Sequence, residues 1–124
     1  MCTTSDTGWQ APSVSQIREQ TEAVFKKPPC LFQIELCMAQ LHSQYTMQDI
    51  ISTASTGSGK TLCFLMPLLF NGGKLSIIVT ALNLLGEQFG RQLEAANITA
   101  ISVTASNANK ATFQVRNNMC KDYT

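Results

Sequence analysis

The segment with the strongest consequences for the fold is a glycine loop between two apolar stretches. Residues 53–61 read T-A-S-T-G-S-G-K-T. Gly57 and Gly59 allow backbone conformations that a side chain would forbid, so the N–H groups of such a loop can turn inward around an anion. Lys60 adds an ammonium group and Thr61 a hydroxyl. The pattern is typical of loops that bind the phosphates of nucleoside triphosphates, and these loops lie between a buried strand and a helix.

The sequence on both sides of the loop fits this arrangement. Segments rich in apolar and β-branched residues are predicted strands: a short one that begins at 50–51 and runs into the glycine loop, and two more at 75–80 and 98–103. Helices are predicted at 61–70, where Pro67 limits the length, and at 84–96. Alternation of strands and helices predicts an α/β fold, with a parallel sheet flanked by helices.

The residues before the loop predict two more helices. Ser13 or Ser15 is suited to cap the first helix, and Lys26-Lys27-Pro28-Pro29 ends it. The second is amphipathic over 30–41, with apolar residues at helical spacing: Leu31, Ile34, Cys37, Met38 and Leu41. We expect an N-terminal tail and helix over 1–27, a nucleotide-binding lobe over 28–106 and a polar end over 107–124.

Composition excludes several classes of protein. The chain is 44% hydrophobic and 14% charged, which suits a folded core, and its net charge of +1 gives no argument about nucleic acid. Its five cysteines include no C-x-x-C pair, so neither a zinc site nor a disulfide framework is predicted. Cys37 and Cys63 are expected to be buried, and the cysteine pattern suits a reducing, intracellular compartment. The longest apolar run, 62–70, is shorter than the about 20 residues of a membrane span, so no membrane partner is expected.

Several ordered motifs resemble those of one family. A-S-T-G-S-G-K-T is similar to motif I of superfamily 2 helicases, and the continuation G-K-T-L-C-F-L-M-P-L-L resembles RecQ-type DNA helicases. Upstream, P-C-L-F-Q, which ends at Gln33, resembles the RecQ motif 0. Downstream, I-V-T-A-L-N-L-L-G-E-Q and I-S-V-T-A-S resemble the next motifs of the same lobe. The resemblance extends over about residues 28–106.

This resemblance implies a partial RecA-like P-loop NTPase lobe of an ATP-dependent 3′–5′ DNA helicase. ATP and Mg²⁺ are the implied cofactors, and single-stranded or junction DNA is the implied partner of the full protein. The implied location is intracellular, in the nucleus if the source is eukaryotic. Gln33 is expected to read the adenine edge, and Thr61 to ligate Mg²⁺. The remaining nucleotide-binding residues are Ser55, Thr56, Gly57, Ser58, Gly59 and Lys60. The implied nucleic-acid contacts are Thr80, Asn83, Thr104 and Ser106.

The family's catalytic parts are not recognisable in this sequence. No acidic D-E-x-[HD] segment follows an apolar strand after Ser106, and the arginines of a second lobe are missing. We therefore expect a fragment that binds nucleotide weakly at best and neither hydrolyses it nor unwinds DNA. Two alternatives stay open: a fragment of a DEAD-box RNA helicase, disfavoured by L-C-F after the loop, and a stand-alone nucleotide-binding module without turnover.

Overall fold

A computed structural model describes residues 10–72 and 74–112. The chain divides into two compact units, Met1–Gly72 and Gly73–Thr124. Most of the predicted N-terminal tail lies outside the described residues, as does most of the predicted polar end.

The first unit is built from helices α1 (Val14–Phe25), α2 (Leu31–Thr46) and α3 (Lys60–Leu65), followed by the 3₁₀-helix η1 (Met66–Leu69). Helix α1 begins where the sequence predicts. The Ser13 side chain accepts a hydrogen bond from the Gln16 backbone N–H (3.2 Å), and the Gln16 side chain accepts one from the Ser13 N–H (2.8 Å). This reciprocal pair satisfies two N–H groups that the helix itself leaves without partners.

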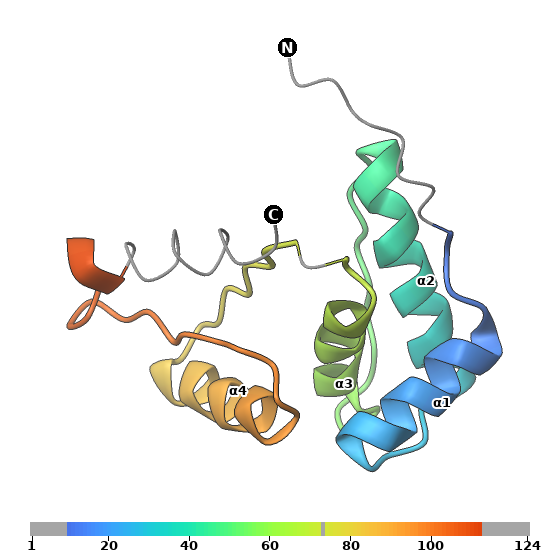
Figure 1. Cartoon of the computed structure of the whole chain (residues 1–124), viewed down its shortest axis with the longest axis horizontal. Helices are drawn as coiled ribbons and strands as arrows, with labels where there is room; N and C mark the ends of the chain where they lie inside the picture. Colours follow the sequence, from blue (N-terminus) through green and yellow to red (C-terminus); the bar gives the residue numbers. More distant parts are fainter. Residues whose placement is uncertain (1–9, 73, 113–124) are drawn as a thin grey trace. The chain divides into compact units, whose positions relative to one another are not determined.

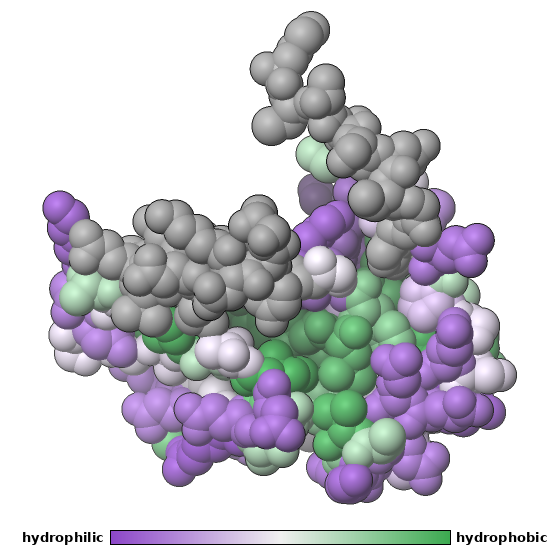
Figure 2. All heavy atoms as spheres, viewed as in Figure 1, coloured by the Kyte–Doolittle hydropathy of each residue, from purple (hydrophilic) through white to green (hydrophobic). Residues whose placement is uncertain are grey.

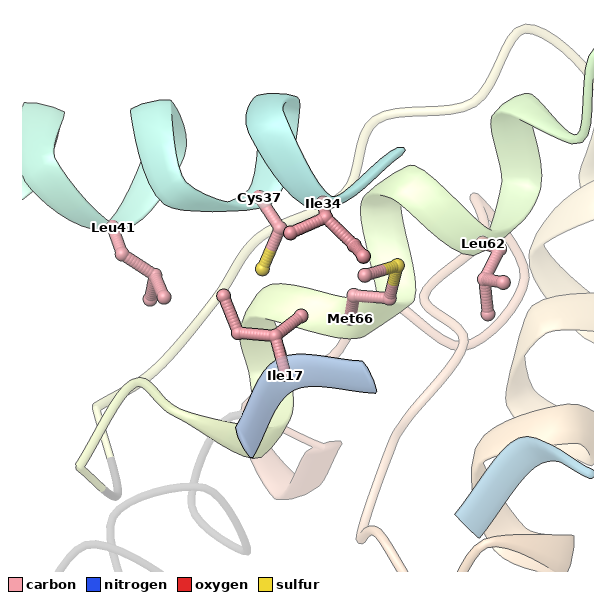
Figure 3. Packing of buried hydrophobic residues seen from close by; sticks show 6 residues of the cluster. All are labelled: Ile17, Ile34, Cys37, Leu41, Leu62 and Met66. Carbon is pink, nitrogen blue, oxygen red and sulfur yellow. The ribbon is translucent and has the colours of Figure 1, made fainter. Parts of the chain in front are cut away.

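The core of the first unit forms where α1, α2, α3 and η1 meet. Helices α2 and α3 lie side by side (Figure 1), and α1 contacts both α2 and η1. Figure 3 shows the side chains that fill this core: Ile17, Ile34, Cys37, Leu41, Leu62 and Met66. The buried face of α2 is narrower than its sequence pattern indicates, because Leu31 (59% exposed) and Met38 (37% exposed) lie at the surface.

The helix after the loop is short, and proline explains why. Helix α3 ends at Leu65 and continues as η1, with Pro67 among the first residues of this 3₁₀ turn. A proline ring clashes with the carbonyl four residues earlier and removes one backbone N–H, so it stops an α-helix. The predicted limit on the length of this helix is confirmed.

The second unit is organised around helix α4 (Asn83–Ala95), which confirms the helix predicted at 84–96. Segments without regular secondary structure precede and follow it. Gly86 of α4 lies against both segments: a Cβ atom at this position would lie 3.1 Å from Ser102 Oγ and 3.6 Å from Thr80 Oγ1. The missing side chain therefore lets the two segments come close to the first turn of α4.

The predicted parallel sheet is wrong. The described residues contain no β-strand, and every element they form is helical. Residues 50–51, 75–80 and 98–103 have no regular secondary structure and pair in no ladder. Several of their apolar side chains are exposed: Ile51 is 94%, Ile77 73% and Val79 91% exposed. Figure 2, coloured by hydropathy, shows that hydrophobic residues reach the surface in one view. Strand propensity measures how well a residue fits a half-buried pleated surface, so it produces a strand only where a neighbouring strand supplies hydrogen bonds.

Candidate nucleotide-binding site

The loop at 53–61 has the backbone that its glycines predict. Gly57 (φ +82°) and Gly59 (φ +75°) both adopt the left-handed conformation. Ser58 N–H donates to the Ser55 carbonyl (3.3 Å), which closes the turn between them. Ala54 stands where this type of loop usually begins with glycine, but it has no positive φ. A methyl group is therefore accommodated there, and the loop needs only its two later glycines.

Lys60 reaches back across the loop that precedes it. Its ammonium donates to the carbonyl oxygens of Ala54 (2.9 Å) and Ser55 (2.8 Å). An ammonium has three N–H donors, so one remains for another acceptor. Lys60 is exposed, and the Thr61 hydroxyl follows it in the first turn of α3. The arrangement concentrates positive charge beside a loop of backbone N–H groups.

Gln33 lies against the phosphate loop although it is distant in the sequence. It occupies the first turn of α2 and is 7% exposed. Its Oε1 accepts from the Cys30 backbone N–H (2.8 Å), and its Nε2 donates to the Gly59 carbonyl (3.0 Å). A Cβ atom at Gly59 would lie 2.5 Å from Nε2. The side chain predicted to read adenine thus also holds the end of the phosphate loop.

Two features of the loop suit a phosphate group. Within the described part of the chain, the buried Ser58 hydroxyl has no hydrogen-bond partner, and a buried polar group without a partner costs free energy. No atom lies within 4 Å of the place where a Cβ of Gly57 would be, so the backbone there is open to approach. The Ser58 hydroxyl and the remaining N–H of the Lys60 ammonium are donors of the kind that phosphate oxygens accept from.

Two thiols, one in α2 and one in α3, are buried in the first unit. Cys63 Sγ donates a weak hydrogen bond to the Gly59 carbonyl (3.9 Å), and Cys37 is fully buried in the core. Burial raises the pKa of both thiols, that of Cys37 to about 12, with a smaller contribution from its neighbour Cys63. Both stay protonated at neutral pH, which confirms the expectation that they serve as small buried apolar groups.

The four predicted nucleic-acid residues all lie in the second unit. Thr80 Oγ1 donates to the Leu82 carbonyl (3.1 Å), and Asn83 is the exposed first residue of α4. The hydroxyls of Thr104 and Ser106 form a hydrogen bond with each other (2.8 Å). Thr104 and Ser106 are thus bonded directly to each other, whereas Thr80 and Asn83 lie at the start of α4.

The sequence interpretation missed two residues that shape these sites. Cys30 supplies the N–H that fixes Gln33 Oε1, and the Asn107 side chain accepts from Thr104 N–H (2.7 Å). A signal for Asn107 was available, because asparagine after a strand-like segment frequently binds the backbone of its own turn. No comparable signal singles out Cys30, since the bond uses its backbone.

The first unit carries a glycine loop with the sequence pattern of phosphate-binding loops, and this loop joins α2 to α3. A comparison with protein families matches residues 32–122 to the DEAD/DEAH box helicases. The chain therefore belongs to the DEAD/DEAH box helicase family, whose members bind ATP with Mg²⁺ and bind nucleic acids. Comparisons with curated proteins and with solved structures found no match. Across residues 10–72 and 74–112, none of the helices is both long enough and apolar enough to span a bilayer.

Proposed function

We propose that this chain binds ATP with Mg²⁺ through the loop at 53–61, as the nucleotide-binding part of a RecQ-like 3′–5′ DNA helicase. The observation that carries the proposal is the position of the Lys60 ammonium, which lies over a loop with two left-handed glycines and keeps one donor for a phosphate oxygen. Lys60 would hold the β- and γ-phosphates, and the Thr61 hydroxyl would ligate Mg²⁺. Bound ATP supplies the phosphoanhydride bond whose hydrolysis drives helicases.

The other loop residues have supporting roles in this proposal. The backbone N–H groups of Ser55, Thr56, Gly57 and Gly59 would surround the phosphates, and the Ser58 hydroxyl would gain the partner that it lacks. Because the hydroxyl is already buried, a phosphate oxygen that binds it removes an existing cost instead of creating a new one.

Gln33 is proposed to recognise the adenine base. A carboxamide accepts two hydrogen bonds at oxygen and donates two at nitrogen. Cys30 N–H and the Gly59 carbonyl use one of each. One donor and one acceptor remain, and this is the complement that the N6 and N7 edge of adenine requires. The same side chain would then contact the base and the phosphate loop.

Two segments of the sequence carry the RecQ-like assignment over an RNA helicase. One is G-K-T-L-C-F after the loop, in which Leu62 and Cys63 are both buried. The other is P-C-L-F-Q, which ends at Gln33, and the Gln33 side chain donates to the Gly59 carbonyl of the loop. In the second unit, Thr80, Asn83, Thr104 and Ser106 are the proposed contacts to DNA phosphates.

Lys60→Ala tests the nucleotide site. We expect the affinity for Mg-ATP, measured by titration calorimetry, to fall by about tenfold or more, because a hydrogen bond to a charged group contributes about 1.5–3 kcal/mol. Lys27→Ala removes another exposed lysine of the first unit and serves as the matched control. Equal affinities of Lys60→Ala and the parent for Mg-ATP would contradict the site.

Titration with DNA and RNA single strands of matched sequence tests the substrate, and tighter binding of RNA would favour the RNA helicase alternative.

A further inference from the structure

Asn107 is the centre of a hydrogen-bond network in the second unit. Its Oδ1 accepts from the Thr104 backbone N–H (2.7 Å) and more weakly from Thr104 Oγ1 (3.4 Å). Its Nδ2 donates to the Ser102 carbonyl (2.8 Å). Its backbone carbonyl accepts from the Thr112 hydroxyl (2.6 Å). One half-buried side chain therefore joins the end of the segment 98–103 to the turn that follows it.

The segment that Asn107 bonds lies close to α4. Ser102, whose carbonyl accepts from the Asn107 amide, has its hydroxyl 3.1 Å from the place where a Cβ of Gly86 would lie. Gly86 belongs to the first turn of α4, so only a residue without a side chain leaves room for Ser102 there.

The turn presents two hydroxyls as a pair. Thr104 Oγ1 and Ser106 Oγ are 2.8 Å apart, and Ser106 is exposed. Two hydroxyls at this separation can both donate to the oxygens of one phosphate, at the cost of the bond between them and of the weaker bond from Thr104 Oγ1 to Asn107 Oδ1. Their separation depends on the backbone between residues 104 and 106, which the Asn107 bond to Thr104 N–H holds in place.

We propose that Asn107 is a positioning residue for nucleic-acid binding, which holds the Thr104 and Ser106 hydroxyls as a paired ligand for one backbone phosphate. This inference rests on the proposed role of the second unit in DNA binding, and it adds a residue that the sequence motifs do not indicate. Asn107 itself does not contact the phosphate. Its contribution is preorganisation, since a turn already held in its binding conformation loses less entropy when it binds.

The test uses the whole chain and a fluorescein-labelled oligothymidylate, with anisotropy as the readout. We expect Asn107→Ala to weaken binding about fivefold or more, which is the order expected for the loss of one or two hydrogen bonds. The matched control is Asn109→Ala: this residue lies two positions away, and its Oδ1 bonds to Thr112 and not to the Thr104 turn. The control should bind the oligonucleotide as the parent does.

A double-mutant cycle separates positioning from general destabilisation. If Asn107 acts through the two hydroxyls, Asn107→Ala should cause little further loss in a chain that already carries Thr104→Val and Ser106→Ala. Equal losses in both backgrounds, or full affinity of Asn107→Ala in the parent background, would overturn the inference. Affinity for Mg-ATP, measured on the same preparations, should be unchanged and reports on folding of the first unit, and an unchanged circular dichroism spectrum reports on the whole chain.

Ser106→Ala provides a second test that leaves all bonds of Asn107 in place. Because Ser106 is exposed, the substitution does not threaten the fold, and it should weaken oligonucleotide binding on its own. Unchanged affinity would contradict the paired-ligand arrangement. A parent chain that binds Mg-ATP but no oligonucleotide would instead show that the proposed DNA-binding role of the second unit is incorrect, and the inference with it.

Discussion

At the scale of single residues, the contact between Gln33 and Gly59 connects the first turn of α2 to the glycine loop. Gly59 combines a left-handed backbone (φ +75°) with a carbonyl bonded to Gln33 Nε2, and a Cβ atom here would force the Gln33 amide to move. The backbone conformation and the Gln33 contact therefore both favour glycine at this position. Gly57 has a similar φ (+82°), but no atom lies within 4 Å of its absent Cβ, so only the backbone reason applies there.

This difference predicts unequal effects of the same substitution at the two glycines. Both Gly57→Ala and Gly59→Ala should weaken Mg-ATP binding, because alanine in the left-handed region costs about 1–2 kcal/mol. Gly59→Ala should weaken it more, by about a further tenfold, since the new methyl group displaces the Gln33 amide. In a Gln33→Ala background this extra loss should be reduced. Equal affinities of the two alanine variants, compared by calorimetry, would show that the Gln33 contact is unimportant.

The local part of the site could be predicted from the sequence, and the distant part could not. Lys60 bonds to Ala54 and Ser55 within its own loop, so the spacing of the motif contains that geometry. The bond between Gln33 and Gly59 joins positions 26 residues apart, and only the family resemblance indicated that Gln33 belongs near the loop. The other bond of Gln33, in which its Oε1 accepts from the Cys30 backbone N–H, could not be predicted from side-chain types, because a backbone group is the donor.

At the scale of elements, the predicted helices form at or near the expected residues, whereas the predicted strands do not form among the described residues. Helix α1 begins at its predicted cap, α3 ends where Pro67 interrupts it, and α4 begins within one residue of the predicted position. Caps, prolines and periodic apolar residues act over a few positions, so each helix is determined locally. A parallel strand depends on a partner from elsewhere in the chain. Residues 75–80 and 98–103 have the composition of strands without forming them.

The end of α2 offers a test of the local rules. Met47 caps this helix in the left-handed conformation (φ 56°), donates its N–H to the Ser43 carbonyl (2.9 Å) and is 89% exposed. Glycine adopts this conformation without strain, so Met47→Gly should raise the free energy of unfolding by about 0.5–1 kcal/mol. Ala39→Gly places glycine in the middle of the same helix, at an exposed position, and should lower it by about 1 kcal/mol. Urea denaturation followed by circular dichroism measures both, and a loss of stability in Met47→Gly would contradict the assignment of this cap.

At the scale of the whole molecule, the two units differ in what they bury. The core cluster lies in the first unit, where α1, α2, α3 and η1 meet, whereas Leu93 is the buried apolar residue of α4. Among the described residues, no Asp, Glu, Lys, Arg or His is buried. The buried groups that gain or lose a proton are instead the thiols of Cys37 and Cys63, so the response of the first unit to pH is expected at the alkaline end.

Alkaline pH should therefore destabilise the first unit through Cys37. Burial raises the pKa of this thiol from its ordinary value of 9.0 to about 12 in the folded chain, so the folded chain keeps a proton that the unfolded chain loses. The resulting stabilisation is fully present below pH 9.0 and is lost as the pH rises toward about 12. In that window the free energy of unfolding should fall by up to about 1.4 kcal/mol per pH unit, with a contribution of the same sign from Cys63. Cys37→Ala removes one of the two groups and should flatten this pH dependence in urea denaturation. Cys30→Ala, at an exposed position, should change it much less, because Cys30 acts only through its smaller effect on the pKa of Cys63. If Cys37→Ala loses stability as steeply as the parent chain between about pH 9 and pH 11, the buried thiol is not the group that limits the fold at high pH.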